Sequence, residues 1–235
     1  MPRDENRNST YDILTGNATI AEATLPTEIE GLKIVPGSNH LIGATVELIQ
    51  AERREYRLRQ ALEPVRSLYN FIFLDCPPAL DLLTLNALVA ADRLLVPMQA
   101  EYFALEGISE LLTTLGRIQA AFNPTLDIEG VILTMYDERT NLAQQVTENL
   151  RRFFGAKLLK TAIPRNVRLA EAPSYGKPVV LYDSRSRGAE AYRDLAQEIL
   201  ARNNIDSPRA LERKAALQAQ SAPRAETKVR FWPYA

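Results

Sequence analysis

The segment Asn70–Leu80 reads NFIFLDCPPAL. Its apolar residues Phe71 to Leu74 are continuous rather than alternating, which is typical of a strand covered on both faces in a parallel sheet. Asp75 follows at the carboxyl end of this predicted strand, before two prolines. The carboxyl ends of strands in open α/β sheets line the ligand crevice, so Asp75 is a candidate ligand-binding residue.

A strand-end aspartate of this kind commonly positions a Mg²⁺ ion or its water beside a phosphate. The alternative is that Asp75 only caps the turn before the prolines. This segment alone does not decide between the two roles, and other motifs are needed.

Strand-like and helix-like segments alternate along the rest of the chain. Short apolar runs predict strands, and apolar residues repeated every three or four positions predict helices. Such alternation indicates a mostly parallel sheet covered on both faces, a three-layer α/β fold. The helix that ends near Phe153 is expected to stop at Gly155 in a left-handed cap. The other predicted strands are residues 32–35, 93–97, 130–134, 158–163 and 179–181, and the predicted helices are residues 43–62, 82–91, 105–122, 142–153 and 189–202.

Composition limits the class of protein. The chain has 235 residues, of which 46% are hydrophobic and 24% charged, as expected for one sizeable α/β domain. Its net charge of −1 does not draw the whole molecule to nucleic acid or to an anionic membrane. No apolar run approaches the ~18 residues of a membrane span, and the amino terminus has no signal-peptide core, so we expect a soluble cytoplasmic protein. Cys76 is expected to be buried and reduced, and His40 to be a loop or surface residue.

Basic residues gather between Arg151 and Gly188. This segment holds nine basic and two acidic residues, a balance of 9 − 2 = +7 in a chain whose total is −1. The segregation favours a patch that contacts DNA phosphates without reading sequence. The alternative is a set of ordinary surface charges, some of them paired with carboxylates of the Glu190–Glu198 helix. The residues that we expect to bind DNA are Arg168, Lys177, Arg185 and Arg187.

Several long motifs, in the same order, resemble the chromosome-partitioning ATPases of the ParA/Soj type, which belong to the ParA/MinD group of P-loop ATPases. The similarity runs from about Thr10 to Arg202 and is highly specific. It implies a three-layer αβα P-loop NTPase-like fold over residues 1–202, followed by a polar tail, residues 203–235, that we expect to be disordered or partly helical. The motifs are FIFLDCPPALDLLTLNALVAAD, VPMQAEYFALEGISELL, GVILTMYDERTNLAQQV, IPRNVRLAEAPSYGKPVVLYD and SRGAEAYRDLA.

The resemblance also implies site residues and partners. Asp75 in LDCPP would be the catalytic Walker B aspartate that acts on Mg²⁺ and its water. Gln99 and Glu101 would belong to the switch segment that responds to the nucleotide. Members of the family bind nonspecific DNA of the nucleoid as ATP-bound homodimers and meet a ParB-type partner that stimulates hydrolysis. The residues that would cradle the adenine base of ATP are Thr134, Met135, Pro164, Arg165 and Asn166.

One motif of the family is missing. Its members carry a glycine-rich loop of the form KGGVGKT, whose backbone amides and lysines bind the phosphates. This sequence contains no G-x-x-x-x-G-K-[ST] motif. The resemblance therefore implies that the N-terminal strands of the fold are missing, and we expect the chain as given neither to bind nor to hydrolyse Mg²⁺·ATP. Loss of a central strand would also leave the chain insoluble or molten when it is expressed alone.

Two functions of different class follow. The first is a ParA-like partition ATPase, and the second is a nonenzymatic remnant that keeps the DNA-facing and partner-facing surfaces. A MinD-like membrane-associated ATPase is a third, and Pro233 in the aromatic end RFWPYA argues against a membrane-surface helix there. An in-frame KGGVGKT-like segment upstream of Met1 would favour the enzyme.

Overall fold

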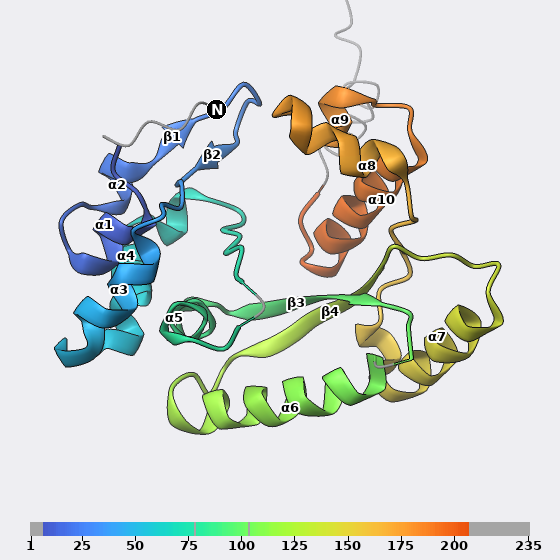
Figure 1. The fold of residues 1–235 in the computed structure, drawn as a ribbon, viewed down its shortest axis with the longest axis horizontal. Coiled ribbons are helices and arrows are strands. Elements are labelled where there is room, and N and C mark those ends of the chain that lie inside the picture. The colour runs from blue at the N-terminus through green and yellow to red at the C-terminus, as the bar shows by residue number, and fades with distance from the viewer. Residues whose placement is uncertain (1–6, 78, 103, 207–235) are drawn as a thin grey trace, which may run out of the picture. The chain divides into compact units, whose positions relative to one another are not determined.

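The computed structural model describes residues 7–77, 79–102 and 104–206, so most of the predicted tail lies outside the described residues. The chain divides into two compact units between Leu159 and Lys160. Figure 1 labels their helices and strands. The prediction of one domain over residues 1–202 stays a prediction.

A parallel ladder forms the sheet of the first unit. Strand β3 (Arg93–Gln99) pairs with β4 (Asp127–Thr134) over their whole length, with one register shift between Leu94 and Leu95. Helix α6 (Ala104–Ala121) makes the crossover that parallel strands require, and it runs beneath both strands in Figure 1. These elements confirm the two strands and the helix predicted for this region. Leu158 adds a single parallel bridge to Val131, so the strand predicted for residues 158–163 is wrong beyond that bridge.

Short helices precede the sheet and share one hydrophobic core. Helix α5 (Leu82–Ala90) confirms the helix predicted for residues 82–91. The two-residue strands β1 (Leu25–Pro26) and β2 (Lys33–Ile34) pair antiparallel beside the helices. The other helices are α1 (Thr10–Thr15), α2 (Ile20–Ala23), α3 (Leu41–Glu47), α4 (Arg57–Leu62) and the 3₁₀ turns η1 (Leu48–Gln50), η2 (Arg54–Tyr56) and η3 (Glu63–Leu68). Their buried core residues are Ile13, Leu14, Ile20, Ala23, Leu48, Leu58, Leu62, Ala87 and Ala90.

The prediction of a single helix over residues 43–62 is wrong, because the helix is interrupted between Ala51 and Arg53. Ala51 is extended and Arg53 adopts a left-handed backbone with φ of 50°. The side chain of Asn86 satisfies backbone groups near this break. Its Oδ1 accepts a hydrogen bond from the Leu58 N–H at 3.1 Å, and its Nδ2 donates to the Arg54 carbonyl at 2.8 Å.

The strand predicted for Phe71–Leu74 is also wrong. The segment has no regular secondary structure, and 71% of Phe73 is exposed. A strand needs a neighbour for its backbone hydrogen bonds, and none of the described strands pairs with this segment. The Phe71 and Phe73 rings stack with centroids 5.9 Å apart. Cys76, which was expected to be buried, is exposed.

Helix α7 (Asn141–Phe154) ends the first unit together with the 3₁₀ turn η4 (Gly155–Lys157). The helix stops at Gly155, as predicted. The φ of Gly155, 54°, is positive, but its ψ of −121° lies outside the left-handed helical region, so the predicted left-handed cap is wrong.

The regular elements of the second unit, over its described residues 160–206, are helices. They are α8 (Val167–Glu171), the 3₁₀ turn η5 (Ala172–Tyr175), α9 (Val179–Tyr182) and α10 (Arg187–Arg202), around the buried residues Ala172, Val179 and Ala189. Helix α10 confirms the predicted last helix. The strand predicted for residues 179–181 is wrong because Pro178 starts a helical turn, in which its carbonyl accepts from the Leu181 and Tyr182 N–H groups. In the described part of the chain, no helix has the length and apolar character to span a membrane.

Candidate functional site

Asp75 lies in the exposed segment that follows Phe73. Its carboxylate makes no hydrogen bond or ion pair with any residue that the structure describes, so it is free to bind a ligand. The neighbouring Cys76 thiol has a raised pKa, because desolvation and the charges of Asp75 and Asp81 disfavour the thiolate. Cys76 is therefore a poor nucleophile.

The carboxyl ends of β3 and β4 bring four predicted site residues together. Gln99 is the register partner of Thr134, the last residue of β4. The Glu101 N–H donates to the Gln99 carbonyl at 2.9 Å, and the Thr134 hydroxyl donates to the Met98 carbonyl at 3.3 Å. Met135 follows with a strained φ of 49°, a feature that is common at functional sites. Residues predicted to form the switch and to cradle adenine therefore share this edge.

An open hollow of about 440 Å³ lies beside α7. The sequence did not predict it, although both basic residues of its lining belong to the positively charged segment. Its lining residues are Tyr136, Gln144, Thr147, Glu148, Arg151 and Arg152.

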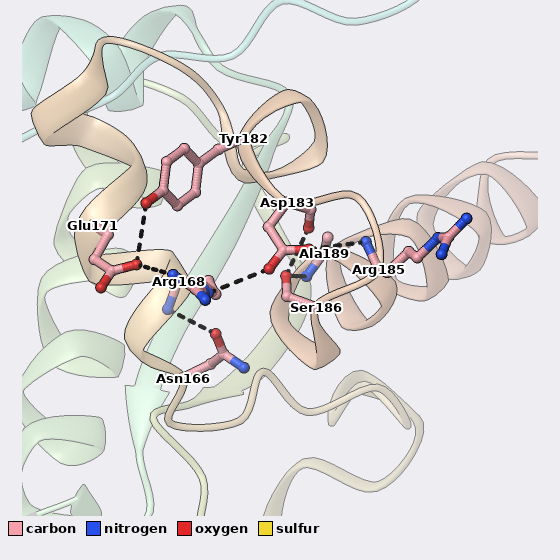
Figure 2. A network of polar contacts seen from close by, with 8 residues as sticks. All are labelled: Asn166, Arg168, Glu171, Tyr182, Asp183, Arg185, Ser186 and Ala189. Carbon is pink, nitrogen blue, oxygen red and sulfur yellow. Dashed lines mark hydrogen bonds and ion pairs between the residues drawn. The ribbon is translucent and has the colours of Figure 1, made fainter.

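Arg168 is the centre of a polar network in the second unit (Figure 2). Its guanidinium contacts Glu171 at 2.8 Å and Asp183 at 3.3 Å. The Asn166 side chain caps α8 by accepting from the Arg168 N–H at 2.9 Å. Arg168 thus joins α8 to the turn after α9, and its charge is shared with two carboxylates.

The other residues predicted to bind DNA carry unpaired charge. Lys177, Arg185 and Arg187 are exposed, and none of them forms an ion pair with a carboxylate in the described residues. Figure 2 shows the Arg185 guanidinium pointing away from the network, while its N–H donates to Asp183 at 3.3 Å. These three side chains can reach a ligand without first breaking an ion pair.

The alternative interpretation of the basic segment holds for part of it. Among the described residues, three of its nine basic residues pair with carboxylates, and none of these carboxylates lies on α10. The pairs are Arg152 with Glu148, Lys157 with Asp127, and Arg168 with Glu171 and Asp183.

Glu198 holds the start of the second unit to α10. Its carboxylate accepts from the Lys160 and Thr161 N–H groups, each at 2.9 Å, and pairs with Arg202 at 3.3 Å. Burial alone would raise the pKa of Glu198, but these hydrogen bonds and the Arg202 charge outweigh it and lower the pKa. A lowered pKa in the folded state means that Glu198 stabilises the fold above its unfolded pKa of about 4.3, and that this stability is lost as the pH falls.

We expect Glu198→Gln to lower the free energy of unfolding by about 1 to 2 kcal/mol at pH 7, because a charged acceptor of two backbone hydrogen bonds is lost. The difference from the unsubstituted chain should shrink as the pH falls below about 4. Urea unfolding of the full chain at pH 7 and at lower pH values measures it. Asp194→Asn, an exposed position on the same helix, is the control. A difference that stays constant with pH would contradict this role.

Three comparisons with known proteins bear on the family. A model of the AAA domain family matches residues 1–128. The ParA chromosome partitioning protein of Caulobacter vibrioides is 48% identical over 202 residues, which cover 85% of this chain and 76% of that protein. The sporulation initiation inhibitor Soj of Bacillus subtilis is 52% identical over 191 residues, which cover 81% of this chain and 76% of that protein.

The chain belongs to the ParA/Soj family. Among solved structures, cobyrinic acid a,c-diamide synthase from Mycobacterium smegmatis, with bound ATP analog and magnesium, is similar with a TM-score of 0.67 and 32% identity. The match covers 81% of this chain and 70% of that protein. The ParA/Soj assignment and the predicted α/β P-loop ATPase-like fold are therefore confirmed.

The residues given for this ParA/Soj chain include some of the groups that Mg²⁺·ATP requires. Asp75 can supply one carboxylate to Mg²⁺, which usually takes one or two carboxylates together with phosphate oxygens. The sequence has no glycine-rich loop to hold those phosphates. Two of the predicted adenine residues, Thr134 and Met135, belong to the first unit, whereas Pro164, Arg165 and Asn166 belong to the second.

Proposed function

We propose that this chain is a chromosome-partitioning protein that holds DNA nonspecifically through its second unit. The observation that carries the proposal is the exposure of Lys177, Arg185 and Arg187 without carboxylate partners among the described residues. Membership of the ParA/Soj family supports the partitioning role.

Phosphate contact suits these side chains. A cation that reaches a DNA phosphate releases a condensed counterion, so each contact adds affinity that is independent of base sequence and sensitive to salt. Arg168 acts differently in this proposal, because its ion pairs to Glu171 and Asp183 fix the turn from which Arg185 projects. Arg168 is a positioning residue that adds a partly exposed charge.

The remaining parts of the proposal rest on family membership alone. They are a homodimer, a ParB-type partner, and association with the nucleoid in the cytoplasm. Asp75 as a metal-binding catalytic residue and Gln99 and Glu101 as switch residues stay predictions of the same kind, as do ATP and Mg²⁺ as cofactors.

A triple variant tests the DNA surface. Replacing Lys177, Arg185 and Arg187 by alanine should weaken binding by a similar factor for duplexes of any sequence. The slope of log affinity against log salt should become shallower by roughly three, about one unit for each lost phosphate contact. Fluorescence anisotropy with two unrelated duplexes, at several KCl concentrations, measures both quantities.

The matched control removes the same charge from the first unit. Lys33, Arg59 and Arg117 are exposed there, and no described carboxylate pairs with them. Their triple alanine variant should keep nearly the original salt slope. Equal slopes for the two triple variants would mean that only net charge matters, and the assigned surface would be wrong.

A nonenzymatic role is the second candidate function, favoured by one observation. Asp75 lies in an exposed segment that pairs with no described strand. The same anisotropy titration with and without Mg²⁺·ATP separates the two candidates. Unchanged affinity would favour DNA binding without a nucleotide cycle, whereas a saturable increase that Asp75→Ala abolishes would favour the partition ATPase.

A further inference from the structure

Two tyrosines of the second unit form a stacked pair. The Tyr175 and Tyr182 rings have centroids 4.9 Å apart and an interplanar angle of 29°. Tyr182 is held in place, because its hydroxyl donates to the Glu171 carboxylate at 3.2 Å and Glu171 pairs with Arg168. Tyr175 is nevertheless 66% exposed. The pair therefore presents an aromatic ring to solvent on a fixed support.

The backbone around Tyr175 is fixed as well. The 3₁₀ turn η5 ends at Gly176, whose φ of 63° lies in the left-handed region. The Gly176 and Lys177 N–H groups donate to the Pro173 and Ala172 carbonyls at 3.0 and 3.2 Å. Ala172 and Val179 anchor both ends of the segment in the core of this unit. Lys177 is thus placed two residues after the exposed ring, by the same turn.

An exposed aromatic ring beside an unpaired cation is the combination that binds single-stranded nucleic acid. The ring stacks on a base, and the cation contacts the adjoining phosphate. In an intact duplex the faces of the bases are already stacked on one another, so the duplex can use only the cation. Stacking is tolerant of sequence because every base has a flat π face.

We propose that this surface binds single-stranded DNA, with Tyr175 stacked on a base and Lys177 on the phosphate beside it. This inference rests on the DNA-binding surface of the proposed function, and it adds that the surface binds the bases of single-stranded DNA as well as the phosphates. Arg168 contributes through Glu171 and Tyr182, which support the stacking ring.

The test uses the full chain and three labelled probes in fluorescence anisotropy: a twenty-nucleotide oligothymidine, an abasic oligomer of the same length, and a duplex. We expect oligothymidine to bind more tightly than the abasic oligomer. Tyr175→Ala should weaken binding of oligothymidine about tenfold, the loss expected for one stacked base. It should change binding of the abasic oligomer and the duplex less than about twofold, and Tyr175→Phe should retain the original affinities.

Tyr192→Ala is the matched control, because Tyr192 is a 43% exposed tyrosine on α10. It should leave all three affinities unchanged. Equal binding of oligothymidine and the abasic oligomer, or no effect of Tyr175→Ala on oligothymidine, would overturn this inference. If either of these results is found while the unmodified chain still binds the duplex, the proposed DNA-binding function stands. If the unmodified chain binds none of the three probes, both the proposed function and this inference are overturned.

Discussion

Replacing Asn86 by alanine is expected to lower the free energy of unfolding by about 3 kcal/mol. Asn86 is fully buried and makes three hydrogen bonds. Its Oδ1 accepts from the Leu58 N–H, and its Nδ2 donates to the Arg54 and Leu82 carbonyls at 2.8 and 3.0 Å. Alanine leaves the Leu58 N–H and the Arg54 carbonyl without this partner, and an unsatisfied buried polar group costs about 1 to 3 kcal/mol.

The effect is large because whole domains are stable by only about 5 to 15 kcal/mol. Urea unfolding of the full chain measures it, with Asn17→Ala as the control. Asn17 is an exposed asparagine whose side chain, among the described residues, donates only to the nearby Thr15 hydroxyl, so its loss should cost little. If Asn86→Ala were as mild as Asn17→Ala, the Asn86 hydrogen bonds would not hold α4 and η2 to α5.

Asn86 also shows why the sequence could not predict the break in residues 43–62. The charge-rich stretch has a helical pattern, and a pattern reports only local preference. The backbone groups of Arg54 and Leu58 are satisfied by an amide that lies 32 and 28 residues further along the chain. A contact of that kind leaves no periodic signal near Arg53, where the helix is interrupted.

The outcome of each predicted strand also depended on contacts with distant parts of the chain. Residues 93–97 and 130–134 form strands because each finds the other as its parallel neighbour. Phe71–Leu74 has an equally apolar run but no described strand beside it, and it stays irregular. Residues 179–181 show the ambiguity of short apolar runs, which fit a buried helical turn as well as a strand.

A count of charges along the sequence was enough to predict the basic residues of the proposed DNA surface. The excess of basic residues pointed to Lys177, Arg185 and Arg187, and the structure leaves them unpaired among the described residues. The same count could not distinguish Arg168, because its two carboxylates lie three and fifteen residues away and only the fold brings them together. The stack of Tyr175 on Tyr182 was likewise invisible, since it depends on how η5 meets α9.

Gly188→Ala is expected to destabilise the chain by about 2 kcal/mol, although alanine is the better helix former. In a helix interior without tertiary contact, the change from glycine to alanine stabilises by up to about 1 kcal/mol. Gly188 lies in the first turn of α10, where an added Cβ would sit 2.6 Å from Leu169 Cγ and 2.9 Å from Leu169 Cδ2. Leu169 Cγ is the branch point of its side chain and not a flexible end that could turn away. The helices α8 and α10 must therefore move apart, and overpacking of this kind costs about 1 to 3 kcal/mol.

Gly116→Ala on α6 is the matched control, because nothing lies within 4 Å of an added Cβ there. It should raise the midpoint of urea unfolding, whereas Gly188→Ala should lower it. A double-mutant cycle with Leu169→Ala identifies the cause, because removing the Leu169 side chain should make Gly188→Ala nearly neutral. Two results would contradict the close approach of α8 and α10 at Gly188. One is a Gly188→Ala variant with a raised midpoint, like that of Gly116→Ala. The other is a Gly188→Ala substitution that destabilises the Leu169→Ala variant as much as the original chain.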